Sequence, residues 1–348
     1  MRRSLRLLLL LAILPAVLAG AYAAAWFTLA GRVRMAIENW AEARRAEGMI
    51  VGWDRYAIGG FPLWMRVTIE KPVYSRRDAI PGYEARGERL IGMARPWALR
   101  RWHVTAPQGA RLAVEPGTDR PALTLEIASL ALEVEPHADA SGEARSGAAL
   151  SFIADRLALA GDSRVTVAHA EGRTAWPPLA VASHRETSLA AEVALQQVTI
   201  PAPLAPLGDT IDRVAARISV KGALPQAPRR DALTAWRQDG GTVELEDLDL
   251  DWRTLSVGAN GTLALDAALQ PEGALTATIR GYGAIVDALA AAGTLRPNEA
   301  GVAKIALGLL AKPGSDGISQ ITAPVTVQNS RVFLGPVLVA RLPKLAWE

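Results

Sequence analysis

The stretch GANGTLALDAALQPEGALTATIRG, residues 258–281, alternates between apolar and polar side chains and contains no group with an obvious chemical role. Successive side chains of an extended chain point to opposite faces, so Leu263, Leu265 and Leu269 are predicted to share one face of a strand. The pattern predicts a β-sheet with one apolar face. The fold class then depends on what covers that face.

The same alternation continues through most of the chain after residue 48. Segments with a period of two, each bounded by Pro or Gly, recur up to the C-terminal end, which is typical of an all-β sheet, sandwich or barrel. Helical spacing returns only in short segments around 229–240, 282–293 and 298–314. We predict a mainly β (α+β) protein: a large curved antiparallel β-sheet or open sandwich with two or three short helices near the C-terminal end.

One predicted strand interrupts the alternation. In TVELEDLDLDW, residues 242–252, the polar residues Glu246 and Asp247 are adjacent, so the pattern changes phase between Leu245 and Leu248. A β-bulge, in which one strand carries an extra residue, is the simplest way to keep both leucines on one face.

The N-terminal segment is predicted to enter a membrane. Three arginines precede an apolar run from Leu7 to Ala30, and a bilayer core of about 30 Å needs roughly 20 apolar residues in a helix. A cleaved signal peptide is the alternative, because Ala21 and Ala23 resemble the small residues of a cleavage site, but such a peptide has a shorter apolar core. We predict a cytoplasmic tail at residues 1–6 and a transmembrane anchor or uncleaved signal at 7–29.

A juxtamembrane amphipathic helix is predicted at residues 30–48. Leu29, Val33 and Ile37 fall three or four residues apart on one stripe with Trp40, which is typical of a helix with one apolar face. The stripe packs on the following domain or lies on the membrane surface, and the acidic residues of the helix disfavour the second interpretation. The remaining residues, 49–348, form the predicted β-rich exported domain of a single-pass inner-membrane protein, with the bulk of the chain in the periplasm.

Charge is distributed unevenly along the chain. The net charge is +3, but residues 31–120 contain 16 Lys or Arg against 10 Asp or Glu, and residues 121–348 contain 19 against 25. A basic region directly after a membrane segment favours contact with lipid headgroups. For its tryptophans, packing ranks first and headgroup contact second, and nucleic acid, which such residues bind by stacking, is not an expected partner. The headgroup candidates are Arg32, Arg34, Trp97, Arg100, Arg101 and Trp102.

No catalytic or metal-binding pattern is present in the sequence. The chain has no cysteine, which excludes disulfides, thiolate metal sites and cysteine nucleophiles. Its four histidines are not spaced as metal ligands, and the acidic run at 247–251 has Trp252 and Gly258 where a calcium loop needs glycine and glutamate. We therefore predict a protein that is not an enzyme and has no catalytic residues, metal or cofactor.

Several segments together resemble a known family. They are AEGMIVGWDRYAIGGFPLWM at 46–65, ARPW at 94–97, AWRQDGGTVELEDLDLDW at 235–252, ANGTLALD at 259–266 and LGPVLVARLPKL at 334–345. With the N-terminal anchor, they resemble the bacterial domain of unknown function 2125, over nearly the whole chain. The layout is more loosely similar to the AsmA-like superfamily, which implies a long curved sheet with an apolar groove and a role in organising or moving lipid. The family implies no catalytic residues.

The leading hypothesis is a membrane-anchored envelope protein whose apolar sheet face binds, organises or transfers lipid. The candidate groove residues are Leu245, Leu263, Leu265, Leu269, Leu275 and Ile279, for which packing in an ordinary core is the alternative role. A structural or assembly scaffold that contacts other envelope proteins and has no small-molecule ligand is the second hypothesis. An enzyme acting on envelope polymers would need clustered titratable groups. An outer-membrane barrel also alternates, but the anchor and the helices argue against it.

Overall fold

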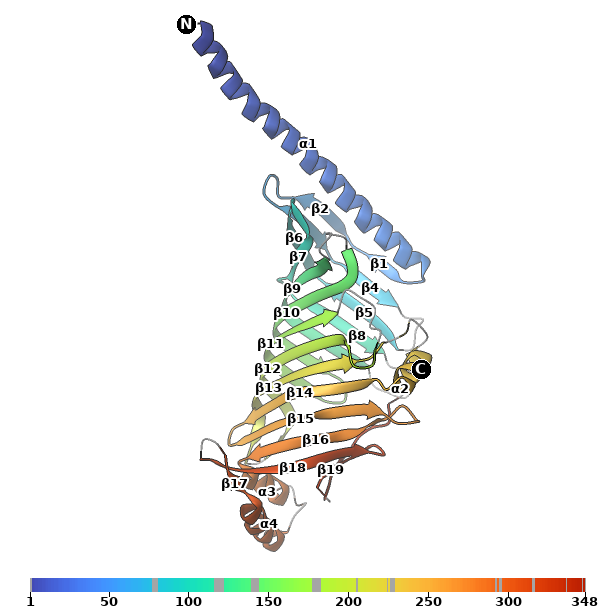
Figure 1. Ribbon diagram of the computed structural model, residues 1–348, viewed down its shortest axis with the longest axis vertical. Coiled ribbons are helices and arrows are strands. Elements are labelled where there is room, and N and C mark those ends of the chain that lie inside the picture. The colour runs from blue at the N-terminus through green and yellow to red at the C-terminus, as the bar shows by residue number, and fades with distance from the viewer. Residues whose placement is uncertain are drawn as a thin grey trace.

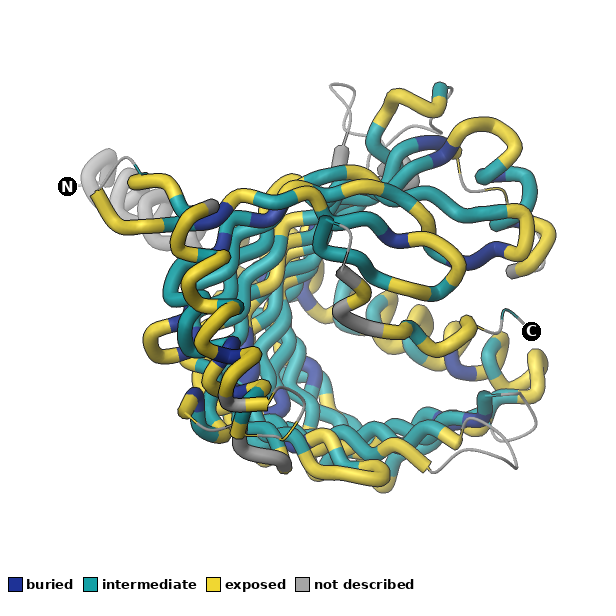
Figure 2. The backbone as a smooth tube through the Cα atoms, turned by 90° about the horizontal axis from the view of Figure 1, so that it is seen from below, coloured by how far each residue is buried: buried dark blue, intermediate teal, exposed yellow. Residues whose placement is uncertain are grey.

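Alternation with a period of two along most of the chain produces one long antiparallel sheet (Figure 1). The computed structural model describes residues 2–76, 81–115, 122–138, 144–176, 183–204, 206–223, 225, 229–291, 293, 296–314, 317–335, 337–345 and 347. Within these ranges, 20 strands pair into a single sheet. Viewed along its long axis, the sheet curls into an open C (Figure 2). The predicted curved antiparallel sheet is therefore confirmed.

The N-terminal part of the sheet forks into two branches that meet at one strand, β9 (Leu123–Ala138). The first half of β9 pairs with β8 and the second half pairs with β7. The first branch runs outward from β9 through β8 (Ala110–Glu115), β5 (Gly82–Gly87), β4 (Val73–Arg76) and β1 (Ile50–Gly52). The second runs through β7 (Ala98–Ala106), β6 (Arg89–Arg95), β3 (Met65–Glu70) and β2 (Arg55–Gly59).

On the other edge of β9, the sheet continues as one series of strands up to β18, whose far edge pairs with both β17 and β19. Their order follows the chain except that β17 pairs with the start of β18. The series comprises β10 (Ala144–Ala160), β11 (Arg164–Trp176), β12 (Thr187–Leu204), β13 (Gly208–Lys221), β14 (Thr242–Trp252), β15 (Leu255–Leu265), β16 (Pro271–Arg280), β17 (Lys312–Pro313), β18 (Ser319–Gln328), β19 (Arg331–Leu334) and β20 (Val337–Arg341).

The helices lie mainly at the two ends of the sheet (Figure 1). The long helix α1 (Arg2–Ala46) projects past the N-terminal end of the sheet. Helix α2 (Arg229–Gln238) precedes β14, and α3 (Tyr282–Ala291) and α4 (Pro297–Leu310) lie at the opposite end from α1. The prediction of two or three short helices near the C-terminal end is confirmed.

Helix α1 joins two segments that the sequence analysis treated separately. The predicted anchor at 7–29 and the juxtamembrane helix at 30–48 form one uninterrupted helix that ends at Ala46. Among residues with described side chains, this is the one helix long and apolar enough to cross a membrane, and signal sequences pass the same test. The junction between anchor and domain is therefore helical.

Strand pairing places the apolar side chains of successive strands on one face. Leu250 of β14 faces Val214 of β13 and Val257 of β15, and the last of these faces Ile279 of β16. We call this the inner face, and the opposite face the outer face. The predicted bulge is confirmed, because the register shifts between Leu245 and Leu248 and leaves both leucines on the inner face.

Glycines stand opposite large apolar residues at several points on the inner face. Phe152 pairs directly with Gly172, and a Cβ added to that glycine would lie 2.5 Å from the ring and 2.7 Å from the carbonyl oxygen of Glu192. Leu275 likewise covers Gly261, and Leu263 covers Gly273. Side chains on the concave side of a curled sheet converge, so a glycine opposite a large side chain leaves room for the curl.

The C-terminal end of the inner face is closed by helix α3. A buried cluster joins Trp252, Leu255 and Ile279 of the sheet to Ala288 of the helix. Helix α4 contacts α3 but leaves one apolar side exposed, formed by Val302, Ile305 and Leu309. This end of the sheet therefore has a packed core shared by strands and helix.

Substitution of Gly172 by alanine is expected to destabilise the protein by about 1–3 kcal/mol, because the new methyl group overlaps the Phe152 ring and a backbone carbonyl. The control is Gly301→Ala in α4, where an added Cβ has no neighbour within 4 Å and better helix propensity raises stability by up to about 1 kcal/mol. Urea denaturation followed by circular dichroism measures both. Equal stability of the two variants would contradict the packing argument.

Candidate functional site

A cavity of about 820 Å³ lies between α1 and the two branches of the sheet. The first branch contributes side chains that include Val51, Tyr74 and Ala85, and the second contributes Val67 and Leu90. Because the branches diverge from β9 and the helix lies across them, the cavity has walls from three directions. Its lining is almost entirely apolar.

The helical wall of the cavity is the apolar stripe of α1. Leu29, Val33, Ile37 and Trp40 all line the cavity, together with Ala36. The stripe therefore faces the β-domain across this cavity. One side of the helix therefore covers a cavity that the sheet alone leaves open.

Trp102 forms part of the cavity wall contributed by the second branch. A Cβ on Gly92 would lie 3.3 Å from its ring, so the absence of a side chain at Gly92 lets the indole lie close to the sheet. The indole Nε1 donates a hydrogen bond to the carbonyl oxygen of Leu99 at 2.8 Å. The polar atom of the ring is thereby satisfied, and its apolar surface is left for the cavity.

The inner face continues from the cavity along the sheet and remains apolar. Strand register links Trp102 to Val134, and the face then passes through Phe152 and Val193 toward β14. Among these, Val193 is an exposed hydrophobic residue. The inner face is therefore covered by α1 at one end and by α3 at the other, with half-exposed apolar side chains between them.

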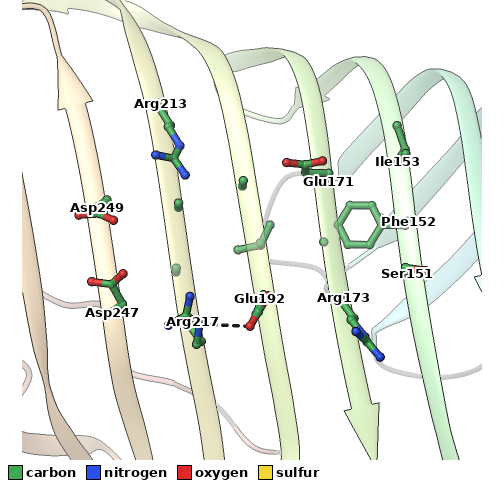
Figure 3. Close-up of a pocket in the computed structure, with 15 residues that line it drawn as sticks. Ser151, Phe152, Ile153, Glu171, Arg173, Glu192, Arg213, Arg217, Asp247 and Asp249 are labelled. Carbon is green, nitrogen blue, oxygen red and sulfur yellow. Dashed lines mark hydrogen bonds and ion pairs between the residues drawn. The ribbon is translucent and has the colours of Figure 1, made fainter.

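The outer face carries charged side chains in rows that cross the strands (Figure 3). Register places Arg173 opposite Glu192, Glu192 opposite Arg217, and Arg217 opposite Asp247. The Arg217 Nε lies 3.1 Å from the Glu192 Oε1. These side chains surround a shallow depression of about 450 Å³. Opposite charges on neighbouring strands stabilise a sheet modestly, and this row needs no ligand to explain it.

A serine, an aspartate and a histidine meet elsewhere on the outer face, in an order that does not suit nucleophilic catalysis. The Ser129 Oγ donates to Asp155 Oδ2 at 2.9 Å, and His169 Nδ1 lies 2.8 Å from Asp155 Oδ1. A catalytic triad places the histidine between the serine and the acid, whereas here the aspartate is central. Among the described residues, no group of three or more His, Asp or Glu has the geometry of a metal site.

A model of one protein family matches most of the chain. The family is described as an uncharacterized protein conserved in bacteria (DUF2125), and the match covers residues 26–343. The chain belongs to the DUF2125 family. No curated protein and no solved structure matches it. The match includes every strand of this DUF2125 protein and the whole of the cavity.

The structure places five of the six predicted groove residues on the inner face. Leu245, Leu263, Leu265 and Leu275 lie there on β14 to β16, and Ile279 is buried beneath α3 as part of the packed cluster. The sixth, Leu269, lies outside the strands, in the turn between β15 and β16. It has a φ of 58° and accepts a hydrogen bond from Trp347 Nε1 through its carbonyl oxygen. These residues do not meet the cavity beneath α1.

The predicted headgroup residues are distributed over different environments. Trp102 points into the cavity, and Arg32 lies at its wall. Arg101 forms an ion pair with Glu135, while Arg100 is exposed on β7. The Arg34 guanidinium lies 5.8 Å from the centre of the Tyr56 ring. Trp97 is exposed in the turn between β6 and β7. Of the set, Trp97 has the most exposed aromatic surface.

The principal cavity was missed by sequence analysis of this DUF2125 protein. Its walls come from segments that are far apart in sequence and meet only because β7 and β8 pair with the same strand. A usable signal was present in the segment RWHVTA, in which Trp102, Val104 and Ala106 alternate with polar residues and therefore share one face. The basic neighbours of Trp102 instead suggested a headgroup contact.

Replacement of Asp155 by asparagine is expected to change stability in a pH-dependent way. The hydrogen bond from His169, followed by that from Ser129, lowers the pKa of Asp155 below its ordinary value of 3.8. An aspartate with a lowered folded-state pKa stabilises the protein fully above the ordinary pKa, and this stabilisation is lost as pH falls through the lowered value. Urea midpoints should therefore favour the wild type at neutral pH, with the difference shrinking below pH 3.8. A difference that persists unchanged in acid would contradict this assignment.

Proposed function

We propose that this protein is a membrane-anchored envelope protein that holds the acyl chain of a lipid in the cavity beneath α1. The observation that carries the proposal is an apolar cavity of about 820 Å³ with one wall made by the helix that is suited to span the membrane. That volume lies within the range of about 300–1,000 Å³ typical of small-molecule sites. The inner face extends the apolar surface beyond the cavity, along the direction in which a long chain would lie.

The energetics of chain burial favour such a ligand. Each methylene group removed from water contributes about 0.8 kcal/mol, so ten buried methylenes contribute about 8 kcal/mol before the cost of ordering the chain. Leu29, Val33 and Trp102 offer apolar contacts without a fixed polar partner. A site of this kind selects an acyl chain by shape and hydrophobicity and leaves the headgroup outside.

The proposed location is the inner membrane, with residues 49–348 in the periplasm. The support for this orientation is the three arginines before the apolar segment, because positive residues that precede such a segment favour its retention in the cytoplasm. The looser sequence resemblance to AsmA-like envelope proteins is consistent with the same arrangement. The proposed role contains no catalytic step.

A scaffold that contacts another envelope protein is the second candidate function. The observation that favours it is the exposed apolar side of α4, formed by Val302, Ile305 and Leu309. A scaffold requires no occupant in the cavity beneath α1. The two functions therefore predict different results when a side chain fills that cavity. Bound lipid is lost if the cavity holds it, and is unchanged if the protein is a scaffold.

Substitution of Ala36 by tryptophan tests the lipid proposal. Ala36 lines the cavity from α1, so a tryptophan there is expected to occupy the space of the chain and to reduce retained lipid about tenfold, the equivalent of about 1.4 kcal/mol. The matched control is Met35→Trp, one residue away on the same helix, which is exposed and does not line the cavity.

Retained lipid is measured by mass spectrometry of full-length protein purified in detergent and washed extensively. Both variants keep the same apolar N-terminal segment, so lipid bound around that segment is the same in each. The proposal requires lipid in the wild type and in Met35→Trp, with loss in Ala36→Trp. Lipid-free wild type, or equal lipid in the two variants, would exclude the cavity as the binding site.

A further inference from the structure

The turn between β2 and β3 packs against α1 at the level where the helix first meets the domain. Gly60 begins this turn with a φ of 97°, and its carbonyl oxygen accepts a hydrogen bond from the Trp64 amide at 2.9 Å. The Tyr22 hydroxyl donates to the carbonyl oxygen of Pro62 at 2.5 Å, and Trp26 Nε1 donates to that of Trp64 at 3.2 Å. The turn is thus hydrogen-bonded to the helix at two successive turns of α1.

Aromatic rings reinforce the contact between the turn and the helix. The Phe61 ring stacks on Phe27 with centroids 5.8 Å apart and meets Trp26 edge-on at 5.5 Å. Trp26 is buried in this cluster. The turn and the helix therefore behave as one unit here, and a surface formed by both has a fixed shape.

The outer surface of this unit is apolar and exposed. Phe27 is 62% exposed, Phe61 47%, Leu63 54% and Trp97 65%. Monomeric soluble proteins rarely expose large apolar side chains in such a group, and those that do usually contact a partner or a membrane. We call these four residues the collar.

A basic side chain lies within the same surface. The Arg95 guanidinium carbon lies 3.7 Å from the centre of the Trp64 ring and 5.7 Å from that of Trp97. Stacking between two indoles leaves the edge of a guanidinium free to bind phosphate, which arginine recognises well. Tryptophan and arginine are both favoured at the level of lipid headgroups.

The length of α1 places the collar at the surface of a bilayer. The last arginine of the N-terminal segment is Arg6, and Leu7 to Trp26 comprise 20 residues. At about 1.5 Å per residue this segment is about 30 Å long, equal to the thickness of a bilayer core. If Arg6 lies at one interface, Trp26 and the collar lie at the other.

We propose that the collar inserts into the interfacial region of the bilayer that α1 spans, with Arg95 bound to headgroup phosphate. The proposal rests on the anchored state proposed above and adds a second membrane contact, made by the β-domain. It commits to lipid rather than protein as the occupant because the collar is continuous with a helix of membrane-spanning length. Leu29 lines the cavity only two residues beyond Phe27, so insertion brings the cavity to the level of the leaflet surface.

Fluorescent labelling of single cysteines tests this proposal in the full-length chain. The natural sequence has no cysteine, so Leu63→Cys provides one labelling site for an environment-sensitive nitrobenzoxadiazole probe. Trp97→Cys provides a second site in the collar, in case the first variant folds poorly. The matched control is Leu309→Cys on α4, which is 84% exposed and lies at the opposite end of the sheet.

The labelled proteins are reconstituted into vesicles of phosphatidylcholine and phosphatidylglycerol that contain lipids with a nitroxide near the headgroup or at the end of the chain. Probes at 63 and 97 are expected to emit at shorter wavelength than the control. The headgroup-level nitroxide should quench most of their fluorescence, and the chain-end nitroxide should quench less. The probe at 309 should remain unquenched.

Resistance of the reconstituted wild type to extraction at alkaline pH reports separately whether α1 is anchored. If the protein resists alkaline extraction but the collar probes are unquenched, or the probes at 63 and 309 are quenched equally, the proposed insertion of the collar is wrong. The anchoring of α1 would still stand. Release by alkali would overturn both. Retained lipid in the Ala36→Trp comparison is independent of these readouts, so failure of the cavity proposal is distinguishable from failure of the collar.

Discussion

The convergence of side chains on the concave side of the sheet is the constraint on which the rest of the structure depends. A sheet with one apolar face curls toward that face only if the side chains there do not collide. Phe152 lies over Gly172 and Leu275 lies over Gly261, so each large side chain meets this condition by facing a residue that has no side chain. Where the curl is tolerated, apolar surface is brought inward without a second layer of structure to cover it.

Coverage of the inner face is correspondingly uneven. Helix α3 provides a packed core around Trp252 and Ile279 at one end. At the other end, the fork at β9 divides the sheet, and α1 bridges the two branches without filling the space between them. An ordinary domain places enough helix on a sheet to exclude water from all of its apolar face. Here α3 does so at one end, whereas the cavity beneath α1 stays open and the intervening strands are half-exposed.

The sequence predicted the local features of this fold because they depend on neighbouring residues. Alternation assigned Leu263 and Leu275 to one face, and adjacent Glu246 and Asp247 identified the bulge. Leu269 was misassigned because β15 ends at Leu265 and the turn that follows holds Leu269 at a left-handed φ of 58°, and leucine carries no signal for that conformation.

The cavity required information that alternation does not contain. Which strand lies beside which is decided by long-range pairing, and Trp102 faces Val67 and α1 only because β7 and β8 share β9. The stripe from Leu29 to Trp40 was visible in the sequence, but the surface that it covers was not. The contact between the turn at Phe61 and Trp26 likewise depends on how the domain packs against the helix.

Because helix α1 is unbroken, it connects the β-domain rigidly to the N-terminal segment. Residues 2 to 46 form one helix, and the turn at Phe61 is hydrogen-bonded to its middle and packs against it. Helices adapt to a mismatch between their apolar length and the thickness of the bilayer by tilting. In the anchored state proposed above, such a tilt would therefore reorient the whole sheet, and the direction in which its open side points would depend on the thickness of the bilayer.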